Sequence, residues 1–334
     1  MPELTWRDAA AGRAVIVRGD VLERASDLLA EHGFEGYDLL STERALAAVP
    51  AAVRDEANGL RLVPPGPVPE ASAAIIDEVG SQALVALGGG RVIDSAKAIA
   101  AVRGGRVAAI PTTLSGAEMT AVHRLPAGHE GAIGVRPALV LGDPELMTSA
   151  PEPRLRATAM NALAHGAESL FTPLADRLSR FAALRGAAMI ARSLDAGTER
   201  DRSELALGAL LSGYAVDRAG LALHHVLSQT TVRVCGTPHA ETNATLLPHT
   251  ASELARRNPE QAEALADALG TNPGGLQARI AELSGGERSL RELGVGRDQL
   301  EQVAEAAMAR PELAAMTPGE IEREQLVRLL GAAW

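Results

Sequence analysis

The stretch from Ala83 to Thr120 constrains the fold most strongly, because it places a glycine-rich turn between an apolar run and a helical pattern. Ala83–Leu87 predicts a buried strand, and Gly88, Gly89 and Gly90 follow it directly. From Asp94 to Ala101, apolar and polar residues alternate with the period of a helix. A helix that starts after a strand presents free N–H groups and the positive end of its dipole to a phosphate. We therefore expect an anion-binding turn here.

A second polar turn follows the next predicted strand, Arg106–Ile110. It contains the hydroxyls of Thr112, Thr113 and Ser115, close to a glycine. An isolated triple glycine is equally consistent with an ordinary strand-to-helix turn. Because ligands of open α/β sheets bind at the carboxyl ends of neighbouring strands, the second turn favours a binding site.

Strand and helix patterns alternate through residues 1–150, which predicts a dinucleotide-binding α/β domain with a parallel sheet covered by helices. Residues 151–334 contain long Ala- and Leu-rich helical segments and predict an all-helical domain, with the reaction site in the cleft between the two domains. The strands are expected at residues 14–18, 37–41, 60–63, 83–87, 106–110 and 138–141, and long helical segments at 153–170, 177–194, 204–234 and 300–308.

Composition narrows the possible partners. The net charge of −10 argues against a nucleic-acid partner, which requires a basic face. The single cysteine, Cys235, excludes an intrachain disulfide. The N-terminal MPELTWRDAAAG has no apolar leader segment, and no run is long and apolar enough to span a bilayer. We expect a cytoplasmic protein that acts on a small molecule, without a membrane partner and as a homodimer, the usual state of soluble enzymes.

Several blocks of the sequence, in the same order, resemble the iron-containing alcohol dehydrogenase superfamily, which includes dehydroquinate synthase, and within it the maleylacetate reductase branch. The blocks are GGGRVIDSAKAIA, IPTTLSGAEMT, GDPELMTSAP, AMNALAHGAESLF, GTPHAETNATLLPH and SLRELGVGRDQLEQVAEAAM. The resemblance implies a dehydroquinate synthase-like fold, with a Rossmann-like N-terminal domain and an all-α C-terminal domain. It also implies NADH- or NADPH-dependent reduction of a small oxo acid or related carbonyl compound.

In metal-dependent members of the superfamily, matching motifs supply an Asp and a His four residues apart and two later His ligands. This chain has His165, His225 and His239 at the histidine positions, but Asn161 at the position of the Asp. A neutral amide binds a divalent cation more weakly than a carboxylate does, so metal affinity should fall. The maleylacetate reductase branch also has Asn there and is regarded as not requiring iron. Three imidazoles can nevertheless hold zinc, so an iron or zinc site at Asn161, His165, His225 and His239 stays an alternative.

Reduction of a carbonyl leaves negative charge on oxygen, which a metal ion or a protonated imidazole would stabilise. Without a metal, protonated His165, His225 or His239 could donate the proton. Gln229 stands four residues after His225, where the family usually has another histidine of the site, and an amide cannot transfer a proton near neutral pH. Residues 316–319 read MTPG where related reductases have an Asn-Pro-Arg segment, which removes a guanidinium that could bind a substrate carboxylate.

For the cofactor, we expect Gly88, Gly89, Gly90 and Asp94 to cradle the pyrophosphate and Thr112, Thr113 and Ser115 to lie near it. Ser41 and Thr42 end the second predicted strand, where an Asp for the ribose hydroxyl is common, so NADPH is permitted as well as NADH. Lys97 either helps to hold the cofactor or pairs with acidic neighbours. Three rival functions stay open: a metal-dependent alcohol dehydrogenase, a non-redox enzyme of the dehydroquinate synthase type, and a cofactor-binding protein without catalysis.

Overall fold

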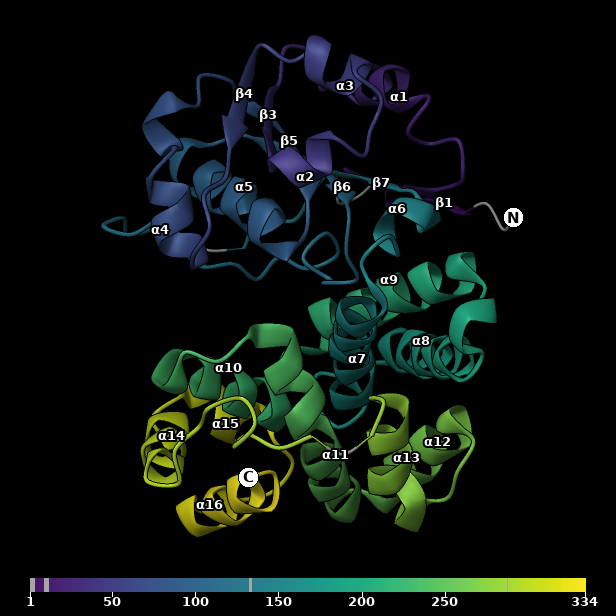
Figure 1. Ribbon diagram of the computed structural model, residues 1–334, viewed down its shortest axis with the longest axis vertical. Coiled ribbons are helices and arrows are strands. Elements are labelled where there is room, and N and C mark those ends of the chain that lie inside the picture. The colour runs from purple at the N-terminus through teal and green to yellow at the C-terminus, as the bar shows by residue number, and fades with distance from the viewer. Residues whose placement is uncertain (1–3, 9–11, 132–133, 287) are drawn as a thin grey trace. The chain divides into compact units, whose positions relative to one another are not determined.

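The computed structural model describes residues 4–8, 12–131, 134–286 and 288–334 (Figure 1). The chain divides into two compact units, an N-terminal unit, Met1–Ala150, and a C-terminal unit, Pro151–Trp334. No helix in the described part of the chain combines the length and the apolar character that a membrane crossing needs. Residues 1–3 and 9–11, which form part of the stretch expected to lack a leader, are outside the described residues.

The N-terminal unit is built on one seven-stranded sheet with the order β1-β2-β7-β6-β5-β3-β4. Neighbouring strands are parallel except for β1, which pairs antiparallel with β2. This confirms the predicted parallel α/β fold; the mixed polar and apolar segment LTWRD did not predict strand β1. The strands are β1 (Leu4–Asp8), β2 (Arg13–Val17), β3 (Asp38–Ser41), β4 (Gly59–Leu62), β5 (Ala83–Gly88), β6 (Arg106–Pro111) and β7 (Leu139–Gly142).

Both faces of this sheet are buried, which explains why its central strands are continuous apolar runs rather than alternating ones. Leu39 belongs to the hydrophobic cluster on one face and the next residue, Leu40, to the cluster on the other. Helix α5 (Gly90–Arg103) covers the second face through Ile93 and Ile99. The other helices of this unit are α1 (Ala25–Glu31), α2 (Glu43–Leu46), α3 (Ala52–Asp55), α4 (Val68–Ala73) and α6 (Pro144–Met147).

The chain changes its direction along the sheet between β3 and β5. The strand after β3 is its outer neighbour β4, whereas β5 leads through α5 to β6 on the opposite side. Ligands of open α/β sheets bind outside the carboxyl ends of the strands at such a switch point. Ser41 ends β3 and Gly88 ends β5, so the residues predicted to bind the cofactor lie at this edge of the sheet.

The described part of the C-terminal unit is all-helical, as expected (Figure 1). The helical segment expected over 204–234 is divided, because Gly220 adopts a left-handed φ of 81° and ends α9 there. The helices are α7 (Glu152–Ser169), α8 (Arg177–Asp195), α9 (Arg202–Ala219), α10 (Leu223–Cys235), α11 (His239–Arg257), α12 (Pro259–Leu269), α13 (Leu276–Leu283), α14 (Gln299–Met308), α15 (Pro311–Met316) and α16 (Arg323–Ala332).

Helix α7 lies at the centre of this unit, in contact with α8, α9 and α11. Close packing between helices depends on glycine here: a Cβ at Gly166 would come within 2.9 Å of Ser212 Oγ, and one at Gly186 within 2.6 Å. The resulting tight bundle buries α7 from Ala159 to Ser169 on all sides. Polar side chains in that segment therefore need partners inside the protein.

Candidate active site

The glycine turn and the second polar turn meet in the N-terminal unit. Gly89 caps α5, which starts at Gly90 and thus four residues earlier than the expected Asp94. A Cβ at Gly89 would lie 3.1 Å from Thr113, and one at Gly90 would lie 3.0 Å from Ser115. None of Gly88, Gly89 and Gly90 has a positive φ. Gly89 and Gly90 are therefore explained by the close approach of Thr113 and Ser115 to the start of α5, and Gly88 by that of Val92, which would lie 2.7 Å from a Cβ there.

Lys97 links α5 to the second polar turn. Its side chain is completely buried, and its Nζ donates to Asp94 Oδ1 at 2.8 Å. The same ammonium group donates to the carbonyls of Ala117 and Val122, at 3.1 and 2.7 Å. Of the two roles left open for Lys97, the structure shows the ion pair with an acidic neighbour. Asp94 is thereby fixed beside the first turn of α5.

The other residues predicted to bind the cofactor have structural hydrogen bonds. The backbone N–H of Thr112 donates to the Gly88 carbonyl at 3.0 Å. Ser41 is fully buried, and its hydroxyl donates to the Leu87 carbonyl at 2.8 Å, which joins β3 to β5. Thr42 caps α2 and accepts a hydrogen bond from the N–H of Ala45. For Ser41 and Thr42, contact with the ribose stays a prediction.

Glu118 is a buried carboxyl group in the second polar turn that sequence reasoning did not single out. Burial raises its pKa to about 7, against the opposing effect of the Lys97 charge. The hydroxyl of Ser115 donates to its Oε2 at 3.4 Å. The N-terminal unit therefore contains a group that can change charge near neutral pH beside the predicted cofactor turn.

In the C-terminal unit, three helices bring the predicted histidines together. The rings of His165 on α7 and His225 on α10 stack, with centroids 4.7 Å apart and planes 10° from parallel. His239, the first residue of α11, is close enough for its charge to oppose protonation of both. Asn161 lies one helical turn before His165 and is also buried. We call His165, His225 and His239 the imidazole cluster.

Beside the imidazole cluster, sequence reasoning missed Glu168. Its Oε2 lies 2.6 Å from Nδ1 of His225, and its Oε1 accepts the backbone N–H groups of His224 and His225 at 2.6 and 3.3 Å. Glu168 is completely buried, and burial raises its pKa. The sequence feature that could have identified Glu168 is its spacing from His165, because a residue three positions later lies on the same face of a helix.

Burial opposes protonation of His165 and His225. It lowers the pKa of His225 to about 3, assisted by the charges of His239 and Arg310, and it lowers the pKa of His165 well below its usual value. The imidazolium form of these two residues stays a prediction, and burial opposes it. His225 Nε2 and His165 Nδ1 are buried and have no hydrogen-bond partner among the described residues. Both nitrogens can serve a bound ligand.

His224, next to His225, has a different role. Its Nδ1 lies 2.8 Å from the Thr250 hydroxyl and its Nε2 lies 2.9 Å from Asn243 Oδ1. The amide nitrogen of Asn243 in turn donates to the carbonyl of His239 at 2.8 Å. Both ring nitrogens of His224 are thus used inside the protein, and the residue supports the position of His239.

The family's metal does not fit this arrangement. The lone pair of an imidazole nitrogen lies in the ring plane, where a metal sits at about 2.0 Å. The rings of His165 and His225 are nearly parallel and stacked, and their planes do not converge steeply on one point. Asn161 supplies no negative charge, and no three described His, Cys, Asp or Glu side chains are placed to hold a metal.

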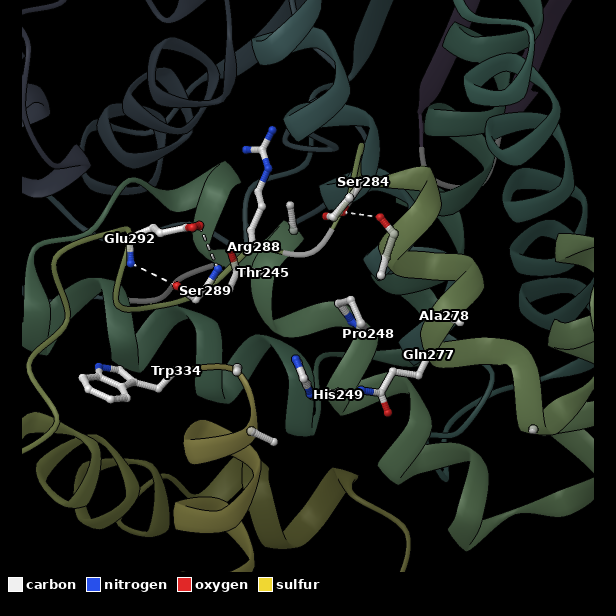
Figure 2. A pocket seen from close by; sticks show the side chains of 16 residues that line it. Thr245, Pro248, His249, Gln277, Ala278, Ser284, Arg288, Ser289, Glu292 and Trp334 are labelled. Carbon is white, nitrogen blue, oxygen red and sulfur yellow. Dashed lines mark hydrogen bonds between the residues drawn. The ribbon is translucent and has the colours of Figure 1, made fainter.

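A cavity of about 610 Å³ in the C-terminal unit lies between α11, α13 and the segment around Trp334. Figure 2 shows His249 and Gln277 side by side in it and Arg288 directed away from them. None of the residues of the imidazole cluster lines this cavity. The imidazole cluster is the candidate reaction site, because buried titratable groups with perturbed pKa values cluster at functional sites.

Both units of the chain match models of one protein family. The family model for iron-containing alcohol dehydrogenase matches residues 16–151, and the C-terminal model of the Fe-containing alcohol dehydrogenase family matches residues 156–334. Maleylacetate reductase 1 of Rhodococcus opacus is 33% identical over 83% of this chain and 80% of its own. The maleylacetate reductase of Sphingobium indicum is 31% identical over 96% of this chain and 94% of its own.

The structural comparison covers the whole chain. The crystal structure of maleylacetate reductase from Agrobacterium tumefaciens matches with a TM-score of 0.86 and 27% identity, over 100% of this chain and 98% of that one. These findings confirm the resemblance and the predicted fold. The chain therefore belongs to the iron-containing alcohol dehydrogenase family and is an oxidoreductase.

Proposed function

We propose that this oxidoreductase transfers a hydride from NADH or NADPH to a small oxo acid of the kind that maleylacetate reductases reduce. The observation that supports this most is the buried imidazole cluster bonded to Glu168, with the amide Asn161 where metal-dependent relatives have a carboxylate. Such a site is suited to move a proton without a metal ion. The relatives named above supply the substrate class.

The cofactor would be bound by the N-terminal unit. The first N–H groups of α5 and the positive end of its dipole would face the pyrophosphate beyond Gly88–Gly90, with Asp94, Thr113 and Ser115 around it. When bound, NADH or NADPH supplies the hydride. Because no acidic side chain stands at Ser41 or Thr42, a phosphate on the ribose is not repelled from that position.

The imidazole cluster would supply the proton. Hydride addition leaves negative charge on the substrate oxygen, and His225 Nε2 would donate a proton to that oxygen. Glu168 Oε2, 2.6 Å from Nδ1, would pass its proton to His225 as the other leaves, so that the buried ring stays neutral. The two backbone N–H groups at Oε1 would then stabilise the Glu168 carboxylate. His165 and His239 would contact the substrate.

A direct assay tests this function. Purified protein is mixed with maleylacetate and either NADH or NADPH, and oxidation of the nicotinamide is followed by absorbance. Turnover with wild-type protein and its loss in His239→Ala, with cofactor binding retained, are expected. Cofactor binding without turnover of maleylacetate or other small oxo acids would contradict the proposal. The homodimer stays a prediction, which light scattering of the purified protein would test.

A further inference from the structure

Arg310 brings a guanidinium group to α10, beyond the imidazole cluster. It stands between α14 and α15, and both helices pack against α10. Pro311 follows it and excludes the helical conformation at Arg310, whose φ and ψ are −87° and 119°. Only 18% of its side chain is exposed. The turn therefore presents a mostly buried cation from a fixed backbone position.

The hydrogen bonds of Arg310 leave much of its binding capacity unused. Its Nη1 donates to Gln229 Oε1 at 3.0 Å, and its Nη2 donates to Glu312 Oε1 at 3.4 Å. These are two of the five N–H donors of a guanidinium, and the described residues supply no acceptor for the others. Glu312 is about half exposed and also lies within range of the Arg233 charge.

The position of Gln229 connects Arg310 to the reaction site. Gln229 is one helical turn after His225 on α10, on the same face of the helix. Gln229 is a neutral acceptor, so it orients the guanidinium without cancelling its charge. Residues 316–319 read MTPG and contain no guanidinium, whereas Arg310 brings one to α10 from another turn.

We infer that Arg310, oriented by Gln229, binds a carboxylate of the substrate and so selects anionic oxo acids over neutral carbonyl compounds. This inference rests on the proposed function. A guanidinium binds a carboxylate through two parallel hydrogen bonds, a geometry that lysine cannot reproduce. Arg310 is thus a specificity-determining residue, and Gln229 is its positioning residue.

The test compares the substrate acid with its uncharged ester and uses succinate as an unreactive ligand. The ratio of kcat/KM for maleylacetate to that for its dimethyl ester is measured in wild type, Arg310→Gln, Arg310→Lys and Gln229→Glu. We expect Arg310→Gln to lower kcat/KM for the acid roughly ten- to hundredfold and to change that for the ester by less than about threefold. Arg310→Lys should recover only part of the loss. Gln229→Glu, which neutralises the guanidinium, should lower the same ratio.

The matched control is Arg323→Gln, which removes an arginine from the exposed ion pairs of α16 and should leave the ratio unchanged. Equal losses for acid and ester in Arg310→Gln would overturn the inference while leaving the proposed function intact. Calorimetric binding of succinate to the NADH-loaded protein separates the two claims. Succinate binding that depends on Arg310, in a protein that does not reduce maleylacetate, would support the anion site and contradict the proposed function.

Discussion

Two buried side chains, one in each unit, differ in whether their polar atoms have hydrogen-bond partners. Lys97 in the N-terminal unit is fully buried, and its ammonium group has three hydrogen-bond acceptors around it. His225 in the C-terminal unit is also buried, but its Nε2 has no partner among the described residues. A satisfied buried charge fixes structure, whereas an unused buried nitrogen is available to a ligand. The comparison assigns scaffolding to Lys97 and chemistry to His225.

The largest expected effect is a loss of turnover on removal of His225 Nε2, the buried nitrogen without a partner among the described residues. His225→Gln removes the group placed to donate the proton and should lower kcat about a hundred- to ten-thousandfold. NADH affinity should stay within about twofold, because the predicted cofactor turn is in the other unit. Steady-state kinetics and fluorescence titration with NADH measure the two quantities. His249→Gln, in the cavity of Figure 2, is the control and should keep full turnover. Unchanged kcat in His225→Gln would remove the proposed role.

The next effect is one of stability. Lys97→Met leaves Asp94 and two carbonyl groups without their cation, and we expect it to lower the free energy of unfolding by about 3 to 5 kcal/mol. Urea unfolding measures this loss. Arg54→Met, which breaks an exposed ion pair with Asp55, is the matched control, with an expected loss below about 1 kcal/mol. Equal losses in the two variants would show that Lys97 is not a structural cation.

Glu118 provides a pH test in the same unit. Its pKa is raised to about 7 from a usual 4.5, so the folded protein binds the proton more tightly than the unfolded chain does. Wild-type stability should therefore fall by about 3 kcal/mol through this group as the pH rises from about 4.5 to 7. Glu118→Gln should remove that fall, and unfolding curves at several pH values measure it. The same slope in variant and wild type would contradict the assigned pKa.

The smallest expected effect tests whether the Ser41 hydroxyl only supports the sheet or also contacts the cofactor. Ser41→Ala removes the bond to the Leu87 carbonyl and should cost about 1 kcal/mol of unfolding free energy. If the hydroxyl serves only this bond, NADH and NADPH affinities stay unchanged. Titration with both nucleotides checks this, and a selective loss of either would show that Ser41 contacts the ribose as the sequence predicts.

Local patterns predict the fold well. The apolar run Ala83–Leu87, the glycines after it and the repeat of this pattern at Arg106–Ile110 indicate parallel strands, because such strands are encoded by consecutive residues. The break at Gly220 was harder to find, since an Ala- and Leu-rich sequence continues on both sides of it. Strand β1 depends on pairing with β2 more than on its own residues.

The candidate site was predicted only in part, for a physical reason. His165, His225 and His239 stand in motifs, and the structure places them together. The contact between Glu168 and His225 joins residues 57 positions apart, and the one between Arg310 and Gln229 joins residues 81 apart. Such contacts arise from the packing of α7, α10, α14 and α15, which periodicity within one segment does not encode.

The most direct test of the central claim is turnover of maleylacetate with NADH after exhaustive treatment of the protein with a chelator, with its metal content measured in parallel. The account predicts that turnover persists in metal-free protein, because neutral imidazole and Glu168 move the proton. Loss of turnover that Fe²⁺ or Zn²⁺ restores would contradict it.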